Sequence, residues 1–431
     1  MSSGSPLAPF LDKIPRRKYR GGISENMERP IERKANPVGE PMKPGAVSIS
    51  RRYELDWLRV ITIAAVFIYH SGRFFDPTDW HVKNPVLHPS LLPIMKIFEL
   101  WGMPLLFVIS GAGVYYALGK RNSAVFLKDR TLRLFVPLVA GIFTHIMWQV
   151  YLERLSHGQF RGSFFAFIPR YFDGMYGFGG NFGWTGLHLW FLEMLFVFSL
   201  ILLPLFLWMR RGSGRDVLDW FVERIASPGA VYLMAIPVML LLALPNPATP
   251  WTARVFGGWS LVAFIPFFLN GFAIVSNEKL YESVLRWRGV SLTAAIILTL
   301  VMSVWFSRNG EPVFGTAAYA TILSLYGLSS WTWVLAVLGF SARHLHVPRR
   351  FLFYANEAVL PFYILHQTVL LTLGYGIIRQ PIPHLLKWAV IALGSFVVSL
   401  GLYEVLVRRI NVLRVLFGMR PASRPTTSNS S

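Results

Sequence analysis

Residues 55–74 read LDWLRVITIAAVFIYHSGRF, and this stretch decides the fold. A helix of this length covers roughly 30 Å, which is the thickness of the hydrocarbon core of a bilayer. Comparable apolar runs recur along nearly the whole chain as far as Val407. One such run fits a core helix of a soluble protein, but about ten require a membrane as solvent. The sequence therefore predicts an all-α, polytopic integral membrane bundle of about ten transmembrane helices.

The composition agrees with a membrane protein. Of the 431 residues, 54% are hydrophobic and only 15% are charged, whereas soluble domains carry roughly 25% charged residues. The absence of cysteine excludes disulfides, thiolate catalysis and metal sites built on cysteine, and no other cluster has the spacing of metal ligands. The net charge of +20 is best explained as a topology signal, so we expect no nucleic-acid partner.

Three regions follow from the pattern. Residues 1–50 are rich in Pro, Gly, Ser, Lys and Arg and are expected to form a disordered basic tail. Residues 51–410 form the predicted membrane domain, and residues 411–431 form a short C-terminal tail. The predicted spans are 55–74, 91–118, 132–153, 187–208, 230–245, 257–276, 289–306, 315–340, 352–377 and 386–407.

The distribution of Lys and Arg predicts the orientation. If both termini are cytoplasmic, the inner loops together with the C-terminal tail carry about twice as many basic residues as the outer side, as the positive-inside rule requires. Residues 75–90 and 154–186 then form the two long outer loops. Both contain aromatic side chains, among them Trp80 and Trp184, which suit a carbohydrate acceptor. The alternative interpretation is an interfacial aromatic belt with flexible glycine joints.

The first span contains two ionisable residues, Arg59 and His70. Eleven positions apart, they share one helix face at depths that differ by roughly 16 Å. Arg59 at the cytoplasmic edge suits an anionic donor, and His70 in the outer half suits a proton acceptor. The alternative makes Arg59 a snorkelling anchor beside Asp56 and His70 a packed polar residue.

These residues carry a resemblance to the membrane-bound acyltransferase-3 family. Arg59 and His70 match its Arg-x10-His signature within Leu55–His70. Further similar segments follow in order, namely Phe107–Gly111, Arg130-Thr131-Leu132-Arg133 and His188-Leu189-Trp190-Phe191-Leu192. Within the family, Trp80–Asn84 and Tyr363–Gln367 most resemble the glucan biosynthesis protein C branch.

The resemblance implies an O-acyltransferase that moves an acyl group, such as succinyl or acetyl, from acyl-CoA to a hydroxyl of an extracytoplasmic glycan such as a glucan. It places the protein in the bacterial inner membrane, with acyl-CoA as co-substrate and no bound cofactor. The implied roles are as follows: catalytic, His70 and His366; donor-binding, Arg59, Arg130 and Arg133; acceptor-binding, Trp80, His81, Trp184, His188 and Trp190; supporting, Asp56 and Glu193.

Each role has a structural alternative. His366 and Glu193 suit bonds between helices, and Arg130 with Arg133 suits ordinary topology anchoring. A transporter or flippase for an anionic or sugar-linked solute would use Arg59, Glu193 and His366 to line a path, although no inverted repeat is visible. A membrane scaffold for polysaccharide synthesis is a third interpretation.

Overall fold

The computed structural model describes residues 52–249, 251–255 and 257–422. The predicted basic tail therefore lies outside the described residues. The described part is helical and has no strand, apart from an isolated bridge between Met175 and Phe182. Its α-helices are α1 (Tyr53–Gly72), α2 (Leu92–Lys120), α3 (Ser123–Arg130), α4 (Val136–Ile142), α5 (His145–Ser156), α6 (Phe164–Tyr171), α7 (Trp190–Ile201), α8 (Leu203–Trp208), α9 (Gly212–Ile225), α10 (Ile236–Ala243), α11 (Phe264–Ser276), α12 (Glu278–Asn309), α13 (Ala317–His344), α14 (Arg350–Ile377), α15 (His384–Leu402) and α16 (Asn411–Leu416).

Several of these helices are long and apolar enough to cross a membrane. The five segments that qualify are Pro89–Lys120, Glu278–Asn309, Ala317–His344, Arg350–Ile377 and His384–Val407. Two bent pairs, α3–α4 with α5 and α9 with α10, raise the number to seven if each pair is one span. The chain is thus a multi-pass membrane protein, whereas the count of about ten stays a prediction.

The difference in number has physical causes. Helices α7 and α11 overlap predicted spans but belong to shorter apolar segments, Leu187–Ile201 and Leu261–Ser276. Helix α1 is long enough but carries Glu54, Asp56 and Arg59 in its first two turns. The pair of α9 and α10 bends by 120°, where Gly229 adopts a positive φ of 77° after Pro228, a turn geometry that suits these two residues.

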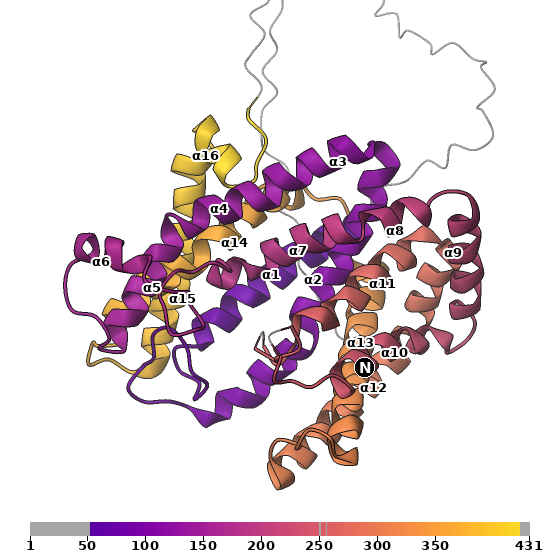
Figure 1. The fold of residues 1–431 in the computed structure, drawn as a ribbon, viewed down its shortest axis with the longest axis horizontal. Helices are drawn as coiled ribbons and strands as arrows, with labels where there is room; N and C mark the ends of the chain where they lie inside the picture. Colours follow the sequence, from indigo (N-terminus) through magenta and orange to yellow (C-terminus); the bar gives the residue numbers. More distant parts are fainter. Residues whose placement is uncertain (1–51, 250, 256, 423–431) are drawn as a thin grey trace, which may run out of the picture. The chain divides into compact units, whose positions relative to one another are not determined.

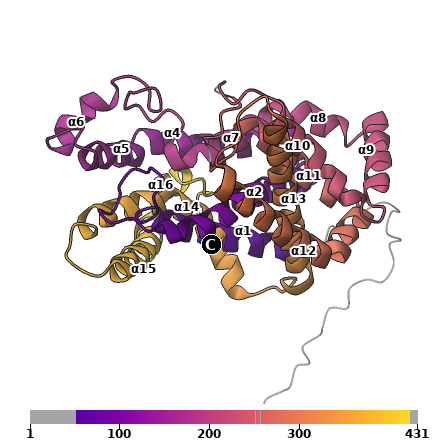
Figure 2. The same cartoon turned by 90° about the horizontal axis from the view of Figure 1, so that it is seen from below.

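Helix α1 occupies a central position and packs against α2, α13, α14 and α15. In both views α5, α6 and α15 lie on one side of α1, and α9, α10 and α12 lie on the other (Figure 1 and Figure 2). Residues on α1 can therefore meet residues from distant parts of the chain.

Helices α2 and α11 approach each other at two glycines. A Cβ atom on Gly111 would overlap the Phe268 carbonyl oxygen, and one on Gly271 would overlap the Val108 carbonyl oxygen. Small residues are what allow two helix backbones to come this close in a membrane protein. Gly111 belongs to the Phe107–Gly111 segment, so that segment has a packing role in this structure.

The membrane-facing surface is visible on the outer helices. Helix α12 exposes large apolar side chains along much of its length, and α15 does the same. These side chains are Ile296, Ile297, Leu300, Val301 and Val304 on α12, and Leu385, Leu393 and Val397 on α15. Apolar surface of this extent is stable against lipid tails rather than water.

Candidate active site

The two histidines that the sequence marks as catalytic lie side by side. Nδ1 of His70 on α1 and Nε2 of His366 on α14 are 3.0 Å apart. Their rings are nearly parallel, with centroids 5.2 Å apart and an interplanar angle of 11°. His366 is fully buried and His70 partly buried, and the rings of Phe67 and Phe362 pack against His366. The pair is thus held between two helices in largely apolar surroundings.

The hydrogen bonds of this pair define which nitrogen is free to act. Nδ1 of His366 lies 2.6 Å from the Tyr363 carbonyl oxygen, and a carbonyl can only accept, so this nitrogen carries the proton. In a neutral ring Nε2 of His366 is then an acceptor, and Nδ1 of His70 donates to it. Nε2 of His70 therefore keeps its lone pair and is the basic nitrogen of the pair.

A third histidine, His188, lies against the pair. Its ring is edge-on to that of His366, with centroids 5.3 Å apart. Nε2 of His188 donates to the Ile364 carbonyl at 3.2 Å, and Nδ1 lies 3.5 Å from the Gln149 amide nitrogen. His188 is buried, so it forms part of the wall behind His366.

The first outer loop contributes Trp80 and His81 to the same region. The Trp80 ring lies 6.1 Å from that of His70. Nδ1 of His81 donates to the Glu153 carboxylate, and Nε2 accepts from the Gln367 amide at 3.2 Å. Gln367 also donates to Gln149 at 3.2 Å. A continuous polar network therefore links His81 to the residues around His188.

The second outer loop is connected to this polar network through Tyr176. Its hydroxyl donates to the Glu153 carboxylate at 2.7 Å. Burial raises the pKa of Tyr176, and the neighbouring Glu153 carboxylate raises it further, so the hydroxyl keeps its proton near neutral pH. Arg154 also contacts Glu153 at 2.9 Å. Glu153 thus connects the two outer loops, which are far apart in the sequence.

Buried ion pairs and hydrogen bonds fix the first outer loop. Asp76 is fully buried and pairs with Arg73 and with Lys83, the latter at 2.7 Å. Partial burial lowers the pKa of Lys83, and the Asp76 carboxylate opposes that shift. Lys387 on α15 donates to Asn84 at 3.2 Å and so ties the loop to a second helix. These contacts hold the loop segment with Trp80 and His81 near His70.

The predicted donor-binding arginines gather near the end of α3. Arg59 pairs with Asp56 at 3.4 Å, the contact that belongs to its alternative interpretation as a membrane anchor. Arg130 and Arg133 lie close enough to each other and to Arg59 for their like charges to repel. Clustered guanidinium groups with few carboxylates form a site that favours a multiply charged anion.

A π-helix, η2 (Thr131–Phe135), begins directly after Arg130. Pro137 follows it and has no N–H to donate to the carbonyl four residues earlier, which favours the wider turn. At positions i and i+3, Arg130 and Arg133 would share one face of a regular α-helix. The structure instead places them across the α-to-π transition, so their spacing around the axis is altered while their proximity is kept.

The remaining predicted residues have separate surroundings. Trp184 is 41% exposed and donates its indole N–H to the Tyr176 carbonyl at 3.1 Å. Trp190 packs against the rings of Phe107 and Phe264. Glu193 on α7 is partly buried and makes no hydrogen bond or ion pair with the described residues. The bond between helices that is the alternative for Glu193 is therefore not seen among the described residues, and its supporting role stays a prediction.

Sequence reasoning missed Gln149, Glu153 and Tyr176. A signal for two of them exists, because His145, Gln149 and Glu153 recur at intervals of four and form a polar stripe on α5. Tyr176 has no comparable signal, since it lies in a loop whose path depends on its tertiary contacts.

Comparison with known proteins gives one match. The family model described as an acyltransferase domain matches residues 52–404, which include all the residues of the histidine and arginine clusters described above. No curated protein and no solved structure matches the chain. Among the described residues, no group of three His, Asp or Glu side chains is placed to hold a metal ion.

Proposed function

The chain belongs to the acyltransferase family whose model it matches, and on that premise we propose that it transfers an acyl group from acyl-CoA to a hydroxyl of an extracytoplasmic carbohydrate. The resemblance of Trp80–Asn84 and Tyr363–Gln367 to the glucan biosynthesis protein C branch makes a glucan the proposed acceptor. Succinyl and acetyl are the proposed acyl groups.

The observation that carries the proposal is the hydrogen-bonded pair of His70 and His366, whose bonds leave Nε2 of His70 as the basic nitrogen. This nitrogen takes the proton of an acceptor hydroxyl while the hydroxyl oxygen attacks the thioester carbonyl carbon. The tetrahedral intermediate collapses, the carbon–sulfur bond breaks, and the leaving thiolate of CoA takes the proton back from His70. The products are an ester and CoA, and no proton or electron is left over.

The arginine cluster supports a CoA donor. Coenzyme A carries several phosphate charges, and Arg59, Arg130 and Arg133 together offer forked donors to such groups. Arg59 and His70 lie on the same helix, with a rise between them of roughly 16 Å. In the proposal the phosphates stay at the arginines while the pantetheine arm carries the thioester toward His70.

The outer loops support a carbohydrate acceptor. Trp80 lies next to His70, and His81 is oriented by Glu153 and Gln367. Phe143, Phe172, Met175 and Phe182 line a hollow of about 380 Å³ together with Gly174. Flat aromatic faces stack on sugar rings, and the hydrogen bonds of His81 and His188 hold the wall of the site in place. We propose Trp80, His81, His188, Trp184 and Trp190 as the acceptor side.

The proposed setting is the cytoplasmic membrane of a bacterium, with both termini inside. It rests on the positive-inside distribution of Lys and Arg. The donor end of the site then faces the cytoplasm, where acyl-CoA is made, and the acceptor end faces outward.

Release of free CoA tests the function directly. The purified chain in detergent is given succinyl-CoA or acetyl-CoA with and without a glucan, and free thiol is followed with a chromogenic disulfide. The chain contains no cysteine, so the protein adds no background. We expect thiol release that needs the glucan. Glucan or anion uptake into proteoliposomes without thiol release would instead establish a transporter.

A further inference from the structure

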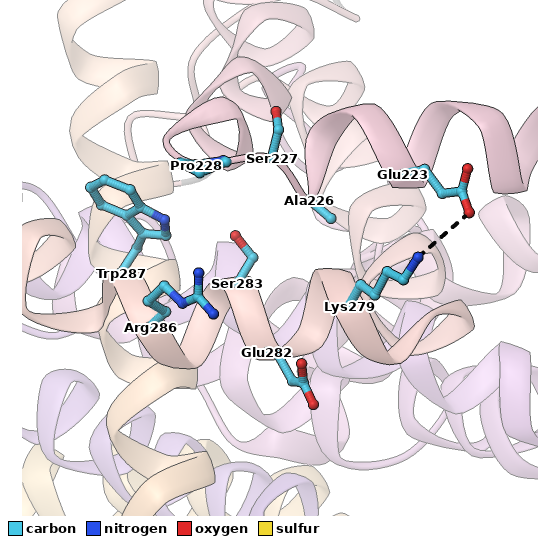
Figure 3. Close-up of a pocket in the computed structure, with 9 residues that line it drawn as sticks. All are labelled: Glu223, Ala226, Ser227, Pro228, Lys279, Glu282, Ser283, Arg286 and Trp287. Carbon is cyan, nitrogen blue, oxygen red and sulfur yellow. Dashed lines mark ion pairs between the residues drawn. The ribbon is translucent and has the colours of Figure 1, made fainter.

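A cavity away from the histidine cluster lies between the turn after α9 and the first turns of α12. Its volume is about 280 Å³, and Figure 3 shows the residues that line it. None of them belongs to the arginine cluster near α3 or to the outer loops. The residues are Glu223, Ala226, Ser227, Pro228, Lys279, Glu282, Ser283, Arg286 and Trp287.

Three hydrogen-bond donors from α12 converge on this cavity. The Arg286 guanidinium and the Ser283 hydroxyl point toward the turn at residues 226–228, and Trp287 stands beside them (Figure 3). The Ser283 hydroxyl and the Trp287 indole nitrogen are buried, and neither has a hydrogen-bond partner among the described residues. Buried polar groups without partners are costly, so a ligand that supplies acceptors would be stabilising.

The charges of the lining favour an anion at these donors. Glu223 is engaged with Lys279 at 3.8 Å, and the carboxylate of Glu282, which also lines the cavity, points away from Arg286 and Ser283 (Figure 3). Arg286 makes no ion pair with the described residues. The part of the cavity beside Arg286 therefore offers a guanidinium, a hydroxyl and an indole N–H, with the Glu282 carboxylate directed away from them, and this set matches the oxygens of a phosphate group.

The depth of the cavity points to the headgroup layer of the membrane. Helix α12 has 32 residues, which at 1.5 Å each is longer than the roughly 30 Å of hydrocarbon. Its first turns, residues 278–288, hold all of its charged side chains except Arg308 at the other end, so they project beyond the apolar part. Helix α9 exposes Val217, Trp220 and Phe221, as expected for a helix that lies in the interface.

We propose that this cavity binds the phosphate group of a phospholipid headgroup, with Arg286, Ser283 and the Trp287 indole as donors. The lipid tails then run beside Val290 and Ile297, which α12 exposes further along the same helix. A free phosphate ion has the same donor preferences, but it gains nothing from those apolar side chains.

Native mass spectrometry of the purified full chain tests the proposal. The lipid probes are phosphatidylglycerol and a phosphate-free diglucosyl diacylglycerol, and inorganic phosphate is the third probe. The test variant is the double change Ser283→Ala with Arg286→Gln. The matched control is Arg211→Gln, which removes an exposed arginine next to α9 that does not line the cavity.

Wild type and the Arg211→Gln control should retain phosphatidylglycerol, and the double variant should bind it roughly tenfold more weakly, since charge-assisted hydrogen bonds are lost. Equal retention by double variant and control, or equal retention of the phosphate-free lipid by wild type, would overturn the site. Variant-sensitive binding of inorganic phosphate without any lipid retention would overturn the lipid assignment. If the double variant misfolds, Ser283→Ala alone serves as the test variant. It should fold, because alanine is a good helix former, and it should still weaken phosphatidylglycerol retention, because one donor is lost.

Discussion

At the scale of single residues, the two histidines of the pair are not equivalent. His366 is anchored through Nδ1 to a carbonyl, whereas His70 presents Nε2 without a partner in that pair. His366 is suited to orient the ring of His70, and His70 is suited to accept a proton. This asymmetry separates the consequences of replacing each of them.

Replacement of His70 should abolish turnover while leaving donor binding intact. Loss of a general base costs about 10² to 10⁴ in rate, and His70→Gln cannot take up a proton, so it should be nearly as inactive as His70→Ala. Thiol release gives kcat, and equilibrium binding of a non-hydrolysable acyl-CoA analogue gives donor affinity.

His366 provides the comparison within the pair. His366→Gln keeps an acceptor oxygen for Nδ1 of His70, so it should retain more activity than His366→Ala. If His366→Ala stops turnover while His70→Ala keeps most of it, the base has been assigned to the wrong histidine.

Glu153→Gln should raise the acceptor KM several-fold with little change in the donor KM. The substitution removes the charge that orients His81 and receives the Tyr176 hydroxyl, and a charge-assisted hydrogen bond is roughly twice as strong as a neutral one. The control is Asp173→Asn, an exposed carboxylate in the second outer loop. Equal effects of the two changes on the acceptor KM would refute a specific role for Glu153.

The sequence identified His70 and His366 individually but not as a pair. A histidine within an apolar run is visible in the sequence alone. That α1 and α14 are neighbours is a property of tertiary packing, and no local pattern in either segment encodes it. Glu153 was missed for a related reason, because it lies at the end of a predicted span where a charged residue is ordinary.

At the scale of elements, the junction of α3 and η2 determines the donor end. The double change Arg130→Ala with Arg133→Ala should raise the donor KM by at least about tenfold through lost charge-assisted bonds, with the acceptor KM unaffected. Lysine at both positions should restore the donor KM only in part, because an ammonium group lacks the planar, forked donors of a guanidinium. Lys128→Ala, an exposed neighbour on α3, is the control, and unchanged donor kinetics in a folded double variant would reject the site.

The contact of α2 with α11 should be sensitive to a single methyl group. Gly111→Ala places a Cβ on the Phe268 carbonyl oxygen, and the backbone shift that follows should cost about 1–3 kcal/mol. Gly113→Ala is an ideal control, since a Cβ there meets nothing within 4 Å. Thermal unfolding in detergent should show a lower midpoint for Gly111→Ala only. Equal midpoints would show that the two helices can separate freely.

Each predicted span overlaps a helix, but the sequence analysis did not predict where these helices bend or break. Apolar length is a local property, so the positions of apolar helices can be predicted from the sequence, whereas the count of ten spans stays a prediction. The bend between α9 and α10, the break before α5 and the π-turn at Thr131–Phe135 depend on how neighbouring helices pack. Pro228 and Pro137 mark two of these places, although a proline in a membrane helix is compatible with a continuous span.

At the scale of the whole molecule, the orientation in the membrane can be measured with few changes. The chain has no cysteine, so each introduced thiol reports its own position. Phe178→Cys, in the predicted outer loop and 73% exposed, should react with an impermeant maleimide added to intact cells. Val125→Cys on α3 should react only after the membrane is opened, and its labelling from outside would reverse the proposed topology.

The anchors of the histidine cluster have a consequence for sequence divergence. His366 and His188 donate to the carbonyl oxygens of Tyr363 and Ile364. These oxygens belong to the peptide backbone, and every amino acid supplies the same one. Substitutions at position 364 can therefore change the surroundings of the cluster during evolution while the anchoring acceptor persists, whereas Tyr363 also donates its hydroxyl to the His188 carbonyl, so its side chain stays tied to the cluster.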